Sequence, residues 1–171
     1  MKSFSKLLVL ALIFLGLNQA WAQSPTKAEQ DNKVAEISDL IAGGRYTFVA
    51  TKLISSKGNS EPLKEGYVLD ISKDTLIARL PGYGPSAAGD SALTYTHFKY
   101  EVVPEKDGSR VITIQPDAER ATALSDIRKV KLTLSALGYG TLTVTGNKRQ
   151  GTFYGYIKPP GAAFPPISAL Y

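Results

Sequence analysis

The sequence predicts a mainly β (α+β) fold, in which one N-terminal amphipathic helix precedes about eight antiparallel strands in a curved sheet, barrel or sandwich. Three observations predict it. Apolar residues recur at helical spacing only between Lys27 and Ala42. From Arg45 onward, apolar and polar residues alternate, which is the period of a half-buried strand. The alternating runs also follow one another at the regular spacing that is typical of antiparallel sandwiches and barrels.

The helix is expected over residues 27–42, because acids and amides separate apolar residues that recur every three or four positions. This spacing gives one narrow apolar stripe, formed by Val34, Ile37, Leu40 and Ile41. The pair Gly43–Gly44 is expected to end the helix, since glycine is the usual residue just past a helix C-terminus.

Eight runs are predicted to be strands: residues 45–54, 66–72, 75–80, 94–103, 109–115, 128–136, 140–146 and 152–158. Half-polar strands in succession favour antiparallel pairing with one face in water. The β domain is therefore expected to span residues 45–158. A proline-rich tail, 159–171, cannot continue a sheet interior, because proline donates no ladder hydrogen bond.

The cleanest alternation lies in residues 128–136. Val130, Leu132 and Leu134 are expected to point inward, and Lys129, Lys131 and Thr133 outward.

The N-terminal segment is predicted to be a secretory signal peptide, residues 1–22. Two lysines precede the apolar run Leu7–Leu17, and the small-residue site Ala20-Trp21-Ala22 follows it. Cleavage there would leave a polar leader and the helix in residues 23–44. The protein is therefore expected to be exported, either to the periplasm or out of the cell.

Charge and composition limit the partners that this chain could have. Loss of the two lysines in the signal segment would lower the net charge from +5 to +3, which does not favour nucleic acid as a partner. The sequence contains no cysteine, so a single core must hold the domain without disulfides. Short strands with outward lysines also argue against a chain that spans the membrane after signal cleavage.

The segment TGNKRQGTFYGYI, residues 145–157, raises the question of a ligand site. A tight turn at Gly138–Tyr139 would place Lys131 near Gly146 and Lys129 near Lys148. Basic and amide side chains would then gather at one end of the sheet and could hold a carboxylate or phosphate. The alternative, which the sequence favours, is a solvated hairpin end whose charges only discourage unwanted strand pairing. The candidate ligand-binding residues are Arg128, Lys129, Lys131, Lys148, Arg149 and Gln150.

No catalytic motif, metal site or cofactor site is predicted. His97 is the only histidine and is expected on the polar face of a strand, whereas zinc needs three or four ligands, thiolates or imidazoles among them. Asp70 and Asp74 lie near a turn, where acids are common for conformational reasons. An enzyme is therefore not expected.

Three stretches occur in a characteristic order: GRYTFVAT, GYVLDISKDTLIARLPGYG and GTLTVTGNKRQGTFYGYI. The positions that carry the pattern are Tyr46-Thr47-Phe48, Asp70, Asp74, Leu80-Pro81, Asn147, Arg149, Gln150, Tyr154 and Gly155. Their order and spacing resemble domain-of-unknown-function family 4251, secreted proteins of Gram-negative bacteria, over nearly all of the chain after the signal segment. The loop GYGPSAAGDSAL departs from the family, which tends to have an aromatic pair and an arginine there. The resemblance implies export and a compact domain, and it implies no known activity.

Two function classes follow from these observations. The first is a non-enzymatic binding module for a small or anionic ligand or a peptide, and small inward residues such as Ala78 and Gly155 would favour it if they bounded a cavity. The second is a structural or interaction component of the cell envelope that docks through a sheet edge or the C-terminal tail. A hydrolytic enzyme is third.

Overall fold

The computed structural model describes residues 26–55, 58–83, 92–117, 127–147 and 149–161. The expected signal peptide and residues 162–171 of the expected tail lie outside these ranges. The chain divides into a short unit, Met1–Asn32, and a main unit, Lys33–Tyr171. All the tertiary packing described below lies within the main unit.

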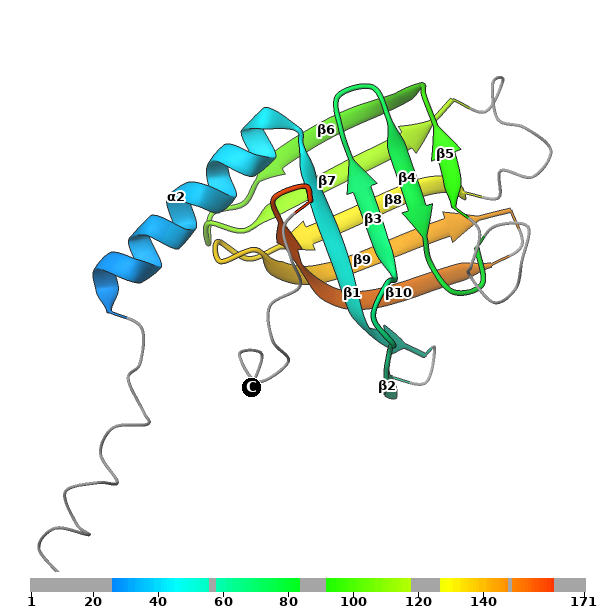
Figure 1. Cartoon of the computed structure of the whole chain (residues 1–171), viewed down its shortest axis with the longest axis horizontal. Helices are drawn as coiled ribbons and strands as arrows, with labels where there is room; N and C mark the ends of the chain where they lie inside the picture. The colour runs from blue at the N-terminus through cyan, green and yellow to red at the C-terminus, as the bar shows by residue number, and fades with distance from the viewer. Residues whose placement is uncertain (1–25, 56–57, 84–91, 118–126, 148, 162–171) are drawn as a thin grey trace, which may run out of the picture. The chain divides into compact units, whose positions relative to one another are not determined.

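The main unit contains a nearly closed, barrel-like sheet of ten strands, in which every pairing is antiparallel. Neighbours follow the order β5-β4-β3-β1-β10-β9-β8-β7-β6, and β2 pairs with β1 beside this path. In Figure 1, β3 and β4 cross in front of β6, β7 and β8. The strands are β1 (Tyr46–Ile54), β2 (Ser60–Pro62), β3 (Val68–Ile71), β4 (Leu76–Arg79), β5 (Leu93–Tyr95), β6 (Phe98–Pro104), β7 (Arg110–Pro116), β8 (Ile127–Leu134), β9 (Tyr139–Gly146) and β10 (Gln150–Lys158).

The predicted helix is confirmed as α2 (Lys27–Gly43). Its start is fixed by a reciprocal pair: Thr26 N–H donates to the Glu29 carboxylate (2.7 Å), and Glu29 N–H donates to the Thr26 hydroxyl (3.4 Å). The Thr26 N–H and the Thr26 hydroxyl both donate to the Glu29 carboxylate, and these two bonds lower the pKa of Glu29 because they favour its ionised form. The helix ends where Gly44 adopts a φ of +60°.

The apolar stripe of the helix packs against the sheet within the main unit. Ile37 and Ile41 are buried, while Val34 and Leu40 are half-buried. Ile37 lies so close to the β8–β9 turn that a Cβ on Gly138 would lie 2.6 Å from its Cδ1 atom. Only glycine fits at this contact.

The interior of the sheet is filled by side chains. The predicted inward residues of β8 are fully buried, and their outward neighbours are exposed. Ala78 is fully buried in the core. Beside Gly155, the ring of Phe48 would come within 2.8 Å of an added Cβ. The Phe48 ring therefore fills the space beside Gly155, a small inward residue that could have bounded a cavity.

The predicted strand 94–103 is two strands in the structure. β5 ends at Tyr95 and β6 begins at Phe98, with a corner at Thr96 and His97. These two strands are the opposite ends of the sheet, and no ladder among the described residues joins them. The barrel therefore has a seam beside this corner. Among the described residues, no helix is long and apolar enough to cross a membrane.

Candidate functional site

The turn between β8 and β9 lies earlier in the chain than the sequence predicted. Ser135 N–H donates to the carbonyl of Tyr139 (2.8 Å), and Gly138 N–H donates to the carbonyl of Ser135 (3.0 Å). Gly138 has a φ of +83°. This is a three-residue loop that ends on a left-handed glycine, one of the common hairpin connections. The predicted tight turn at Gly138–Tyr139 is therefore wrong.

This turn changes the register on which the predicted basic cluster depended. Lys131 lies opposite Thr143 and Lys129 lies opposite Thr145, rather than near Gly146 and Lys148. Both lysines are exposed on the outer face of β8. Lys148 itself lies outside the described residues.

The remaining described candidates make contacts of their own. Arg128 Nε donates to the Asn147 side-chain oxygen (2.6 Å). The guanidinium of Arg149 lies 5.8 Å from the centre of the Tyr83 ring, a cation–π contact. Gln150 is exposed at the start of β10, opposite Thr145. Thr145 thus lies between Lys129 and Gln150 in the sheet, while Arg128 and Arg149 contact Asn147 and Tyr83.

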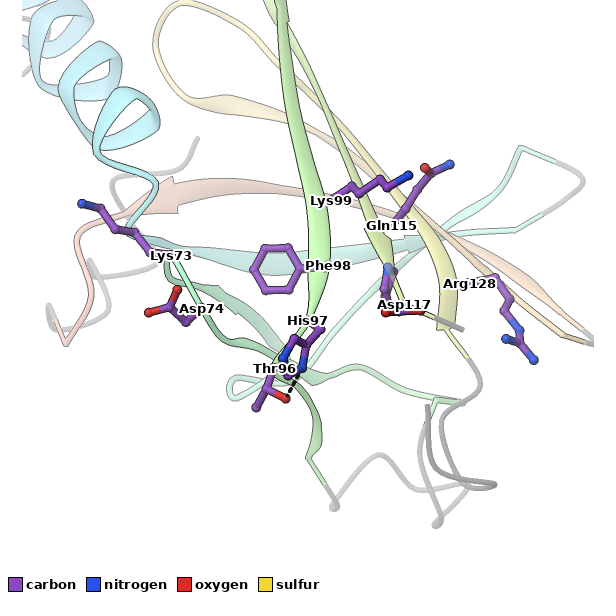
Figure 2. Close-up of a pocket in the computed structure, with 10 residues that line it drawn as sticks. Lys73, Asp74, Thr96, His97, Phe98, Lys99, Gln115, Asp117 and Arg128 are labelled. Atoms are coloured by element: carbon purple, nitrogen blue, oxygen red, sulfur yellow. Dashed lines mark hydrogen bonds between the residues drawn. The ribbon is translucent and has the colours of Figure 1, made fainter. Parts of the chain in front are cut away.

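A hollow of about 770 Å³ lies at the corner between β5 and β6, and Figure 2 shows the residues around it. Four segments of the described chain contribute to it: the β3–β4 turn, the β5–β6 corner, the end of β7 and the start of β8. Of the described candidates, only Arg128 borders it. The described lining residues are Lys73, Asp74, Thr96, His97, Phe98, Lys99, Gln115, Pro116, Asp117 and Arg128.

A backbone hydrogen bond joins two of the segments that line this hollow. Asp117 N–H donates to the carbonyl of His97 (3.0 Å), which holds the end of β7 against the corner. The Thr96 hydroxyl lies 3.0 Å from Nδ1 of His97. Phe98 and Pro116 lie opposite each other on β6 and β7 and supply apolar surface.

Charged groups surround this apolar part. Lys73, Lys99 and Arg128 are basic, and Asp74 and Asp117 are acidic. In Figure 2, Lys73 lies on one side of the Phe98 ring and Arg128 on the other, with its guanidinium directed away from that ring. Among the described lining residues, the three basic side chains outnumber the two acidic ones by one.

Further along β6, a pair of tyrosine hydroxyls crosses the interior. The hydroxyls of Tyr46 and Tyr100 lie 3.1 Å apart. Burial raises the pKa of both phenols, and the neighbouring Tyr100 raises the pKa of Tyr46 further. Both groups are therefore neutral hydrogen-bonding partners at physiological pH, and neither is available as a base.

Within the described ranges, no group of three or more histidine, cysteine or acidic side chains is placed to hold a metal ion. The lone His97 has two carboxylates beside it in the hollow, Asp74 and Asp117.

Sequence reasoning placed His97 on a solvated strand face and missed the hollow. One signal was available. Tyr95 and Phe98 both point inward, yet they are three positions apart. Residues on one face of a continuous strand are two or four positions apart, so the alternation is interrupted between them. A slip of this kind marks a break in a strand, and the corner lies there.

Comparison with known proteins agrees with the fold. The family model described as domain of unknown function DUF4251 matches residues 28–157. A crystal structure of a DUF4251 family protein from Bacteroides eggerthii DSM 20697 is similar with a TM-score of 0.58 and 12% sequence identity, covering 76% of this chain and 91% of that one. No match was found among the curated proteins. Because the family model covers most of the sequence, the chain belongs to the DUF4251 family.

Proposed function

We propose that this protein is an exported, non-enzymatic binding module that holds a ligand with an anionic group and an apolar body in the hollow beside the β5–β6 corner. The observation that carries the proposal is that three basic residues, Lys73, Lys99 and Arg128, line the same hollow as the half-buried Phe98. Export is supported by the signal-peptide pattern of residues 1–22.

The chemistry of the hollow favours this class of ligand over a purely ionic one. Lysine and arginine side chains can pair with a carboxylate, phosphate or sulfonate. The half-buried Phe98 offers apolar surface that a free inorganic anion would leave uncovered. Asp74 and Asp117 can accept hydrogen bonds from donors on the same ligand.

The test uses the mature chain, residues 23–171, and the dye anilinonaphthalene sulfonate, which combines an anionic group with an aromatic body. Binding is followed by the increase in dye fluorescence. Replacing two basic side chains of the hollow, in the double variant Lys73→Gln/Lys99→Gln, should weaken binding by about three- to tenfold, because each exposed ion pair contributes little by itself.

The matched control is Lys106→Gln/Lys131→Gln, which removes the same charge from two exposed lysines that are not among the described residues lining the hollow. It should change dye affinity by less than about twofold. Equal losses in the two double variants would indicate a general charge effect, and a wild-type protein that does not bind the dye would refute the proposal directly.

An interaction component of the envelope is the second candidate, and the open seam at β6 favours it. Docking through the expected tail concerns mainly residues 162–171, which lie outside the described ranges. If the protein is such a component, crosslinking in intact cells should capture a partner through β6 while the dye does not bind.

A hydrolase is the third candidate, and its support is the 3.0 Å contact between the Thr96 hydroxyl and Nδ1 of His97. The two residues are neighbours at an exposed corner, so this contact needs no catalytic explanation. Labelling of Thr96 by a fluorophosphonate probe, lost in His97→Gln, would promote this function over binding.

A further inference from the structure

The outer edge of β6 has hydrogen-bonding groups that no described strand uses. β6 ends the sheet order and pairs only with β7 among the described residues. Glu105 N–H donates to the carbonyl of Ser109, and Asp117 N–H donates to the carbonyl of His97. Since bonding to a neighbour alternates along an antiparallel strand, the odd-numbered residues from 97 to 105 bond toward β7. The backbone groups of Phe98, Tyr100 and Val102 therefore point to the open edge.

The same three residues also leave apolar surface uncovered. Phe98, Tyr100 and Val102 point toward the interior, yet each is only half-buried. Their neighbours on β7, Ile112 and Ile114, are fully buried because β6 and β8 flank them. One more strand along β6 would bury these side chains and satisfy the backbone groups together.

The hollow lies at the N-terminal end of this edge, where β6 starts at Phe98. Every pairing in the sheet is antiparallel, and a strand added in that sense would end its chain near Phe98. Its terminal carboxylate would then lie among the basic groups of the hollow. The charge of the hollow and the direction of the edge thus fit the same occupant.

Resting on the proposed function, we propose that the ligand is the C-terminal segment of an extended peptide, which adds antiparallel to β6 and places its carboxylate in the hollow. Five residues would span the edge from Phe98 to Val102. The alternate residues that face inward should be apolar. The two outward residues would lie opposite Lys99 and Glu101, which are exposed.

The pairing specifies a probe. In the peptide Val-Lys-Val-Glu-Val, carrying a fluorophore at its N-terminus and a free carboxylate, glutamate would lie opposite Lys99 and lysine opposite Glu101. The isomer Val-Glu-Val-Lys-Val has the same composition with both pairs reversed. Fluorescence anisotropy should show the first peptide binding more tightly by about threefold or more, because cross-strand charge pairs are directional.

Two changes in the peptide test its contacts. Replacing the terminal carboxylate by an amide should weaken binding by about tenfold, since a charge-assisted hydrogen bond is lost. N-methylation of the central valine, whose N–H would face Tyr100, should abolish binding. N-methylation of the glutamate, whose N–H would point away from β6, should leave it nearly unchanged.

The protein variant Lys99→Glu/Glu101→Lys keeps net charge and exchanges two exposed side chains. It should reverse the preference and bind the isomer more tightly than the first peptide. Both peptides should bind more weakly than to the wild-type protein, because Lys99 also lines the hollow. Equal binding of the two peptides by both proteins would overturn the antiparallel pairing on β6.

Other occupants give different results. If the protein is dimeric by light scattering and binds neither peptide, and the single variant Lys99→Glu is monomeric, a second copy covers the β6 edge. That result would overturn the peptide proposal. If the dye binds and neither peptide does, the peptide proposal fails and the binding module stands. If neither binds, both fail.

Discussion

Among the described glycines, Gly155 in β10 and Gly140 in β9 are the two where an added methyl group would come closest to a neighbouring backbone. A Cβ on Gly155 would lie 1.9 Å from the carbonyl oxygen of Val49 and 2.8 Å from Cζ of Phe48. Gly155 pairs with Ala50 in the β1–β10 ladder, directly before the irregularity between Ala50 and Lys52. The two backbones are therefore in contact at a place where only glycine fits.

The expected cost of Gly155→Ala follows from these distances. A Cβ essentially never lies within 3.0 Å of another heavy atom, so the strands must separate locally by about 1 Å. Overpacking costs about 1–3 kcal/mol, and each ladder hydrogen bond that is lost adds about 1 kcal/mol. With two bonds weakened, the free energy of unfolding should fall by about 3–5 kcal/mol.

The assay is urea unfolding followed by far-ultraviolet circular dichroism, with two other glycines as matched controls. Nothing lies within 4 Å of a Cβ on Gly43, so Gly43→Ala should be neutral or stabilise by about 0.4–1 kcal/mol. At Gly151 the Cβ would meet the Tyr83 hydroxyl at 3.1 Å and Phe153 at 3.2 Å, which should cost about 1 kcal/mol. The reasoning is refuted if Gly155→Ala and Gly43→Ala unfold at similar urea concentrations.

Three further predictions concern the core, pH and export. Leu132 is fully buried, so Leu132→Ala should lower the free energy of unfolding, measured in urea, by about 2–5 kcal/mol. Thr133→Ser on the outer face should change it little. Equal effects would mean that the other face of β8 is buried. The pKa of Tyr46 is raised in the folded state, so the free energy of unfolding should stay constant below the ordinary tyrosine pKa of about 10 and fall above it. In Tyr46→Phe the free energy of unfolding should fall less steeply with pH. Urea midpoints that fall with the same slope in both proteins between about pH 8 and 11 would contradict this. Protein recovered from the periplasm or medium should begin at Gln23 by intact mass, and a mass that retains residues 1–22 would exclude signal cleavage.

Alternation along the chain was sufficient to predict most of the architecture. Val130, Leu132 and Leu134 point inward as predicted because one buried face requires an apolar residue at every second position. The helix was also predictable, since Ile37 and Ile41 recur at helical spacing and glycines follow. These are local patterns, and each is visible within about ten residues.

The register of β8 and β9 could not be predicted in the same way. Gly138 suits both a two-residue turn and the third position of a three-residue loop, because either can require a positive φ. The choice between them moves Lys131 from Gly146 to Thr143, and the predicted basic cluster depended on it. When a turn residue is compatible with two loop lengths, the two strands can be predicted correctly from the sequence, but the register between them cannot.

The hollow depends on the place where the alternation fails. Thr96 and His97 are both exposed, so the alternation of inward and outward side chains is interrupted between Tyr95 and Phe98. No ladder of backbone hydrogen bonds joins the described residues of β5 and β6 across this corner. Where the ladder stops, β6 keeps backbone groups that no described strand uses and side chains that are only half covered. A barrel that closed here would leave no such edge. The break in pattern that misleads a strand assignment is therefore also the physical cause of the opening that we propose as the binding site.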